Sequence, residues 1–278
     1  KRQDKKKAPA KPRTEGRIRD KGDNKNIEIH GVPGNALGAY LNNCRISVFA
    51  NAQDATGDTM NSGEIVIHGN CGDAAGYGMR DGKIFIKGSA GYRAGIHMKE
   101  YQSHVPVIVI GGKVGDFLGE YQAGGRIIVL GIEHENDCPV GNFCGTGMHG
   151  GAIYIRSEHA PKGLPAQVQC DEATENDIEA IRSDVEEFAE NFGYSADELL
   201  KSHFFKLTPN TANPYKQLYV NNWVFTHKEK YAIETLEPDN INEKIIVGYD
   251  KFYTTDLNDD YDILHINFYG PKSYLFAK

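Results

Sequence analysis

Apolar residues recur with a fixed spacing along the first half of the chain. Seven short runs, starting at residues 26, 45, 64, 83, 107, 126 and 152, carry a branched aliphatic residue at both the second and the fourth position. The second position is isoleucine in every run, and the fourth is isoleucine or valine. In an extended strand these two positions face the same side. The pattern predicts seven short strands with a core-facing ladder of Ile and Val, and an outer surface made by the third and fifth positions.

The spacing of these runs defines a repeat. Successive starts are 19, 19, 19, 24, 19 and 26 residues apart, which is a unit of 19 residues with insertions of 5 and 7. One such unit is too small to enclose a core, so units must stack. We therefore expect an all-β fold, a right-handed parallel β-helix of about seven rungs over residues 26–159. A leucine-rich solenoid fits less well because its LxxLxL pattern and asparagine ladder are absent.

Glycine occupies fixed positions of this unit. The chain has 31 glycines among 278 residues, about 11%, and 25 of them lie between residues 26 and 159. They recur at the ninth and thirteenth positions. Because glycine takes positive φ angles without the penalty of a Cβ, these positions are expected at corners or where backbones pass closely. The candidate structural residues are the repeat glycines Gly34, Gly38, Gly57, Gly72, Gly76, Gly91, Gly95, Gly115, Gly119 and Gly145.

The periodic pattern ends after His159, which predicts three regions. Residues 1–25 form a basic arm, residues 26–159 the β-helix, and residues 160–278 a C-terminal α+β extension. In the extension, apolar residues at steps of 3 and 4 predict an amphipathic, acidic helix over residues 175–192 that Gly193 ends and that packs, for example, on the last rung. Ser195 and Glu198 predict a capping box for a shorter helix.

The last part of the chain is rich in aromatic residues. Residues 204–276 hold 15 of the 28 aromatic side chains, including the single tryptophan, Trp223. Three stretches, 217–225, 243–250 and 262–270, have weak strand character between Asn- and Asp-rich turns. Aromatic segments of this kind commonly wrap a scaffold or meet a partner.

Charge and cysteine content narrow the functional classes. The formal net charge is −7, the wrong sign for a dedicated nucleic-acid binder, although residues 1–13 carry seven Lys or Arg and one Asp. We interpret that arm as a solvated segment, and it lacks the apolar core of a secretory signal. No apolar run approaches the roughly 20 residues of a membrane span. The odd number of cysteines, five, predicts free thiols in a reducing cytoplasm.

Candidate chemistry is sparse. The string GTGMHG at residues 145–150 satisfies GxGxxG, but a dinucleotide site needs a helix after it, whereas a strand-like run follows. His30 and His68 share the outward fifth position and are expected on the surface. The insertion before residue 150 gathers possible metal ligands without a known zinc spacing: Glu133, His134, Glu135, Asp137, Cys138, Cys144 and His149. We expect no catalytic, cofactor or metal site in this chain.

The repeated unit, as in EIVIHGNCGDAAGYGMRDG at residues 64–82, resembles the GXGXG domain that closes the large subunit of glutamate synthase. It also resembles a subunit of formylmethanofuran dehydrogenase. The stretches VPVIVIGGKVGDFLGEYQAGGRIIVLG and VGNFCGTGMHGGAIYIR are similar to the glutamate synthase branch, particularly to its stand-alone subunits, as is HFFKLTPNTANPY at residues 203–215. The resemblance fades beyond about Asn221.

This resemblance implies that partner subunits carry the chemistry. A class II glutamine amidotransferase would release ammonia, and a barrel subunit with FMN and an iron–sulfur cluster would make glutamate from it and 2-oxoglutarate. The GXGXG domain contributes no catalytic residue and holds the other parts in register. N-methylglutamate synthase-type complexes share this layout, so they stay open as alternatives, as do the formylmethanofuran dehydrogenase subunit and an independent carbohydrate-binding β-helix or other binding module.

Overall fold

The computed structural model describes residues 25–132, 134 and 137–210, and four strands between residues 245 and 277. Backbone contacts divide the chain into two modules, Lys1–Asn213 and Pro214–Lys278, and each is described by itself. The three regions expected from the sequence, with boundaries at residues 25 and 159, stay predictions.

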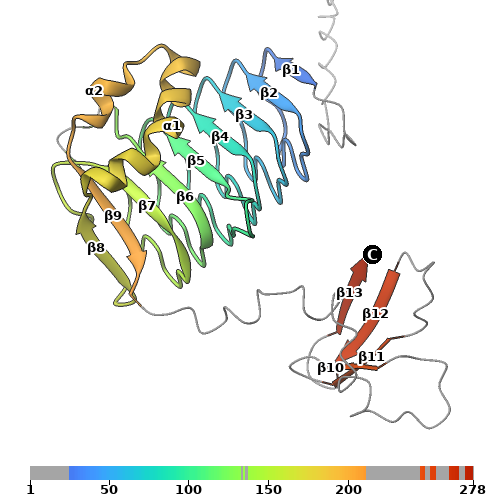
Figure 1. Cartoon of the computed structure of the whole chain (residues 1–278). Helices are drawn as coiled ribbons and strands as arrows, with labels where there is room; N and C mark the ends of the chain where they lie inside the picture. The colour runs from blue at the N-terminus through green and yellow to red at the C-terminus, as the bar shows by residue number, and fades with distance from the viewer. Residues whose placement is uncertain are drawn as a thin grey trace, which may run out of the picture. The chain divides into compact units, whose positions relative to one another are not determined.

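Seven strands of the first module begin the sheet in sequence order (Figure 1). Each pairs in parallel with the next, and the second-position isoleucines form one continuous register from Ile27 through Ile46 to Ile153. The register confirms the unit starts predicted from the apolar pattern. The strands are β1 (Asn26–Ile29), β2 (Arg45–Val48), β3 (Glu64–Ile67), β4 (Lys83–Ile86), β5 (Val107–Ile110), β6 (Ala123–Val129) and β7 (Gly150–Arg156).

Two further strands extend the same sheet beyond the repeats. β9 (Phe204–Pro209) pairs antiparallel with β7, and β8 (Val168–Glu172) pairs antiparallel with β9. The described part of the first module is thus a nine-stranded, mostly parallel sheet with two helices. Part of the C-terminal extension continues the sheet of the repeats.

Both helices lie where the sequence predicts them. α1 (Glu175–Phe192) begins with a capping box between Thr174 and Asp177 and ends at Gly193, whose φ is +76°. α2 (Ala196–Leu200) is capped by the Ser195 hydroxyl, which accepts a hydrogen bond from the Glu198 N–H. Neither of these helices is long and apolar enough to cross a membrane, and the described residues contain no other helix.

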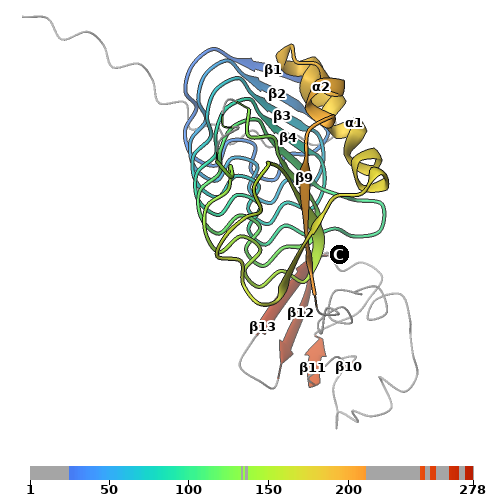
Figure 2. The ribbon, with the colours of Figure 1, turned by 90° about the vertical axis from the view of Figure 1, so that its left-hand side faces the viewer.

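α1 covers the outer face of the sheet, as Figures 1 and 2 show. The third-position side chains Val66, Phe85 and Val109 are at most 1% exposed and belong to one apolar cluster with helix residues, among them Ile181 and Phe188. Burying a side chain of this size stabilises the fold by roughly 1.5–3 kcal/mol. The expectation that third positions form an exposed outer surface is therefore wrong for the central strands, because the predicted helix spans several units.

The main core lies on the other side of the sheet. Second- and fourth-position side chains of β2 to β7 are fully buried and pack against Leu41, Met60, Met79 and Met98 from the same repeats. These four residues share the sixteenth position of the unit. Figure 2 looks along the stack and shows each unit looping away from α1 to close this core.

The second module contains a four-stranded antiparallel sheet in sequence order. Its strands are β10 (Ile245–Val247), β11 (Lys251–Thr254), β12 (Ile263–Phe268) and β13 (Ser273–Ala277). Two of the three stretches with predicted strand character overlap these strands, and the stretch 217–225 lies outside the described residues.

Candidate interaction surface

Opposite the sheet, each of six units contains a six-residue turn segment. These turn segments are residues 36–41, 55–60, 74–79, 93–98, 117–122 and 143–148. Neighbouring segments are joined by backbone hydrogen bonds in both directions: the N–H of Gly57 donates to Leu37 of the preceding unit (2.7 Å), and that of Thr59 to Tyr77 of the following unit (2.7 Å). The turn segments therefore form a second hydrogen-bonded layer, with the core between it and the strands.

Each turn segment contains two overlapping turns. In residues 55–60, the Asp58 N–H donates to the Ala55 carbonyl and the Met60 N–H to the Gly57 carbonyl, both at 3.1 Å. The first, third and fifth residues of all six segments have φ between +51° and +74°. A positive φ at the third residue of a four-residue turn is the geometry of a type II turn. Residues with positive φ thus alternate with residues of ordinary φ along each turn segment.

The third residue is glycine in all six segments, because its missing side chain leaves room for the core. An added Cβ on Gly76 would lie 2.5 Å from Cδ1 of Ile108, and one on Gly95 would lie 2.4 Å from Cδ1 of Ile127. No real Cβ contact is this short, so a larger residue must displace the strand side chains. These glycines occupy the thirteenth position of the unit, counted without the 7-residue insertion in the last one. They are six of the repeat glycines named from the sequence: Gly38, Gly57, Gly76, Gly95, Gly119 and Gly145.

The ninth-position glycines serve close backbone approach. A Cβ on Gly72 would lie 2.9 Å from the backbone N of Asp54, and one on Gly91 would lie 3.0 Å from that of Asp73. Neither glycine has a positive φ. Gly115 approaches the backbone of Gly91 in the same way, at 3.1 Å, and Gly34 is half-buried just before the first turn segment.

Aromatic side chains gather on the outer side of this layer. We define the turn surface as the outward side chains of the six turn segments and of the residue before each. It carries five of the eight large apolar residues that are exposed in the described part of the chain, at 42–54% exposure: Tyr40, Tyr77, Tyr92, Tyr121 and Phe143. Exposed apolar side chains that adjoin one another, unlike scattered ones, are typical of an interaction site.

The rings on this surface are ordered by contacts between units. His97 stacks on Tyr121 with ring centres 5.2 Å apart, and Phe117 stacks on Phe143 at 5.1 Å. The Arg93 guanidinium lies over the Phe117 ring at 5.0 Å, and its Nε donates to Glu120 at 2.9 Å. Aromatic residues and arginine that are held in place before binding are the side chains that dominate protein interfaces.

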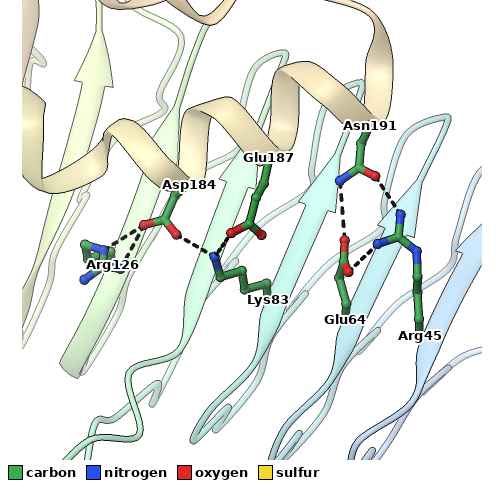
Figure 3. A network of polar contacts seen from close by, with 7 residues as sticks. All are labelled: Arg45, Glu64, Lys83, Arg126, Asp184, Glu187 and Asn191. Carbon is green, nitrogen blue, oxygen red and sulfur yellow. Dashed lines mark hydrogen bonds and ion pairs between the residues drawn. The ribbon is translucent and has the colours of Figure 1, made fainter. Parts of the chain in front are cut away.

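The opposite, sheet side of the module is occupied by α1. Figure 3 shows charged residues at the first position of four repeat units reaching up to this helix. Asp184, 1% exposed, lies between Arg126 Nη2 at 2.8 Å and Lys83 Nζ at 3.0 Å. Lys83 also pairs with Glu187. A buried carboxylate needs such partners because removing it from water costs several kcal/mol.

A second part of the network lies nearer the end of α1. Arg45 pairs with Glu64 and donates from Nη2 to the Asn191 side chain at 2.6 Å, while Asn191 donates to Glu64 at 3.4 Å (Figure 3). Burial alone would lower the pKa of Lys83, but its hydrogen bonds to Glu187 and Asp184 outweigh that effect, so the pKa is raised. These charges are committed to holding the helix on the sheet.

The start of α1 is fixed to the end of the sheet by a separate ion pair. Asp177 accepts from Lys206 of β9 at 2.5 Å and from the Thr174 backbone N–H at 3.0 Å. Burial would raise the pKa of Asp177, but these hydrogen bonds prevail and lower it to about 2. The ion pairs of Asp177 and Asp184 therefore serve to hold α1 on the sheet.

The histidines at the fifth strand position form part of a ring ladder. His30 stacks on Phe49 at 4.7 Å, Phe49 stacks on His68 at 4.5 Å, and Phe192 at the end of α1 meets His68 edge-on at 5.2 Å. Burial, followed by Lys87 and Arg45, lowers the pKa of His68. The expected surface position holds for His30, which is largely exposed, whereas His68 is half-buried under α1.

The GxGxxG string at residues 145–150 runs from the last turn segment into β7. Gly145 and Gly147 have positive φ angles in the last turn segment, and β7 follows GTGMHG where a dinucleotide site would need a helix. Of the insertion, Glu133 and Glu135 lie outside the described residues. Among the residues that the structure describes, no group of three or more His, Cys, Asp or Glu is placed to hold a metal ion. Burial raises the pKa of the Cys144 thiol, and the nearby thiols of Cys138 and Cys170 add to the shift.

Comparison with known proteins identifies the family. A model of the GXGXG motif family matches residues 16–212. The chain belongs to the GXGXG motif family. The resemblance seen in the repeated unit is confirmed. This GXGXG protein is also 50% identical over 199 residues to Uncharacterized protein MJ1350 of Methanocaldococcus jannaschii, an alignment that covers 69% of this chain and 76% of the relative.

The family match coincides with one of the two modules. It ends at residue 212, next to the boundary between the modules at Asn213 and Pro214. The matched region of this GXGXG protein includes all six turn segments, both helices and the nine-stranded sheet. The four-stranded sheet of the second module lies beyond it.

Proposed function

We propose that this GXGXG protein is a non-catalytic structural subunit of a glutamate synthase-type complex that assimilates ammonia into glutamate. Its partners would be a class II glutamine amidotransferase subunit and a barrel synthase subunit, and the FMN and iron–sulfur cluster would belong to the synthase. The observation that carries the proposal is the family match over residues 16–212, because glutamate synthase contains a domain of this kind.

The proposal includes a finer description of the fold, a right-handed parallel β-helix of about seven rungs. The parallel register of β1 to β7 and the hydrogen-bonded turn segments support it. Such a stack is a stiff body in which each unit contacts only its neighbours. A stiff body with several faces in a fixed arrangement is suited to hold other subunits in register.

The chemistry of the described residues is compatible with a scaffold. The strongest ion pairs join α1 to the sheet, and the glycines at fixed positions serve packing. None of its five cysteines forms a disulfide: Cys44, Cys71, Cys138, Cys144 and Cys170. Free thiols persist in a reducing compartment, which favours a cytoplasmic complex.

Purification of the tagged full chain from its own cells tests this proposal. We expect two proteins to remain bound in equal amounts through a salt wash: one amidotransferase with an N-terminal catalytic cysteine and one FMN protein with an iron–sulfur cluster. A tagged, unrelated acidic protein of similar size serves as the control for adventitious binding.

The identity of the bound proteins separates the alternatives. Recovery of molybdenum or tungsten enzyme subunits would favour a formylmethanofuran dehydrogenase-type complex and contradict the proposal. A complex that forms N-methylglutamate from methylamine would move the assignment to the N-methylglutamate synthase type. If the chain purifies alone and binds a polysaccharide, the scaffold proposal is wrong.

A further inference from the structure

The first residues of the six turn segments form a row whose side chains change size at its midpoint. The three units nearest β1 carry alanine, and the three nearest β7 carry arginine or phenylalanine. In order along the stack, this first row is Ala36, Ala55, Ala74, Arg93, Phe117 and Phe143. One half of the turn surface is therefore low along this row, and the other half projects outward.

A second row is formed by the fifth residues of the turn segments, and its four inner members have a similar asymmetry. Thr59 and Gly78 make its low part, whereas His97 and Tyr121 make its raised part. The last member is Gly147, and a Cβ there would lie 2.4 Å from the Tyr121 ring, so that ring leans over it and fills the end of the row. Tyr40, at the opposite end, is 54% exposed.

The first row and the four inner members of the second row are complementary to themselves under a two-fold rotation. An axis that runs along the strand direction, between the third and fourth units, keeps each row opposite itself and reverses the order of the units. We propose that two copies of this chain pack face to face through the turn surface about such an axis. Raised residues of one copy then meet low residues of the other: Arg93 with Ala74, Phe117 with Ala55, Phe143 with Ala36, His97 with Gly78 and Tyr121 with Thr59.

A second copy is favoured as the occupant because its surface has the matching shape. The raised rings are already held in stacks, so little side-chain entropy is lost when the low half of the partner covers them. Six units at about 4.8 Å span roughly 25–30 Å, and with the width of a turn segment the flat footprint is on the order of 400 Å² per copy. The total of about 800 Å² is below the size of a stable interface and in the range of weak contacts, so the dimer should dissociate at roughly tens of micromolar.

The rims of the interface bring carboxylates together. Under the same rotation Asp54 faces Asp116 and Asp58 faces Glu120. Asp54 and Asp116 accept backbone N–H bonds from the next unit, and Glu120 pairs with Arg93. Salt screens repulsion between exposed charges. The dimer is therefore expected to tighten as ionic strength rises.

The pairing of Phe117 with Ala55 can be tested by exchanging sizes. Ala55→Phe places two large rings in contact at both symmetry-related positions, and Phe117→Ala leaves two gaps. Each variant alone is expected to dissociate at least about tenfold more readily than the natural chain. Within one chain the two residues lie in units separated by two others, so they do not touch. Phenylalanine already occupies the first row in two units, so Ala55→Phe is compatible with the fold.

Mixing the two variants in equal amounts provides the decisive measurement. In the mixed dimer, the phenylalanine introduced by Ala55→Phe in one chain meets the alanine introduced by Phe117→Ala in the other, and the second contact is the natural one. Sedimentation velocity of full-length chains should therefore show monomers for each variant and dimers for the mixture. Ser183→Phe, on the exposed side of α1, is the control and should leave the natural dimer unchanged.

Three results would overturn this inference. They are a natural chain that stays monomeric up to about 100 µM, a dimer that neither variant weakens, and two weakened variants that do not recover on mixing. Circular dichroism confirms that the variants are folded. Because the experiment uses only this chain, it can fail while the proposed complex is confirmed, and the reverse.

Discussion

Two glycines of one turn segment allow the cost of overfilling the core to be separated from the cost of a left-handed backbone. Gly76 has a φ of +70°, and an added Cβ would lie 2.5 Å from Cδ1 of Ile108. Gly78, two residues later, has a φ of +57°, and the nearest atom to its added Cβ is Thr59 Oγ1 at 3.7 Å. Alanine at Gly78 therefore meets only the left-handed backbone, whereas alanine at Gly76 meets the same backbone and a filled core.

The two substitutions should differ by the free energy of overpacking. A left-handed conformation costs an L-residue about 1–2 kcal/mol, and forcing a methyl group into a packed core typically costs a further 1–3 kcal/mol. We expect Gly78→Ala to lower the free energy of unfolding by about 1–2 kcal/mol and Gly76→Ala by about 2–5 kcal/mol. At roughly 2–4 °C per kcal/mol for a module of this size, the second variant should melt about 4–20 °C below the natural chain.

Thermal and urea unfolding of both variants measures this difference, and a third substitution identifies its cause. Ile108→Val removes the Cδ1 atom that the new methyl group would strike, and in the natural chain it should cost about 0.5–1.5 kcal/mol. In the Gly76→Ala background the same change should cost less or restore stability. Equal losses for the two alanine variants, or an unchanged cost of Ile108→Val, would refute the packing proposed for the turn segments.

Three further predictions concern single groups. Asp184→Asn should destabilise the chain by about 3–5 kcal/mol in urea unfolding, because two half-buried cations lose their counter-charge. The control, Glu186→Gln on the exposed side of α1, should change stability by less than about 0.5 kcal/mol. Similar losses of stability in the two variants would contradict the role of the network. The pKa of His68, followed by NMR, should lie below 6.5 because burial and neighbouring cations disfavour its charged form. The contribution of the neutral His68 to stability is then complete above pH 6.5 and is lost as pH falls toward the folded-state pKa. A measured pKa above 6.5 would exclude this account. Cys144, buried with a raised pKa, should react with iodoacetamide more slowly than the half-buried Cys138 in the native protein, and the reverse order would be inconsistent with the structure.

The sequence alone places the strands correctly because their signal is local and repeated. A buried strand position tolerates few residue types, so Ile recurs at the second position from Ile27 to Ile153. Once the unit length is known, parallel pairing and register follow. The helix over residues 175–192 is equally predictable from the sequence, because its apolar residues recur at steps of 3 and 4 and Gly193 marks its end.

The position of that helix on the sheet cannot be predicted from the sequence, because its packing depends on residues far apart in the chain. The third strand positions carry Glu28 and Ser47 as well as Phe85, so no single residue type marks the covered face. The contacts that decide it join α1 to residues about 60 to 150 positions earlier, such as the pair of Asn191 and Arg45. Only the folded chain shows that α1 spans β2 to β6.

The turn surface cannot be predicted from the sequence, for a different reason. Its first and fifth residues share a backbone conformation, yet they range from Ala74 to Phe117 and from Gly78 to Tyr121. Positive φ at ten non-glycine residues of these segments is maintained by hydrogen bonds between units, and such bonds leave no residue-type signal in one sequence. A periodic alignment of units could have revealed the change from small to large side chains, but not that these residues face outward together.

Glutamate formation by the assembled complex tests the central claim most directly. The amidotransferase and synthase subunits are combined with and without this chain, and glutamate is measured with glutamine, 2-oxoglutarate and a reductant. The account predicts that glutamine-dependent formation of glutamate from isotopically labelled 2-oxoglutarate falls strongly when the chain is absent, because ammonia then has to reach the synthase through solution. Ammonia-dependent formation by the synthase alone should be largely retained. Equal glutamine-dependent activity without the chain would contradict a role in holding the two subunits together.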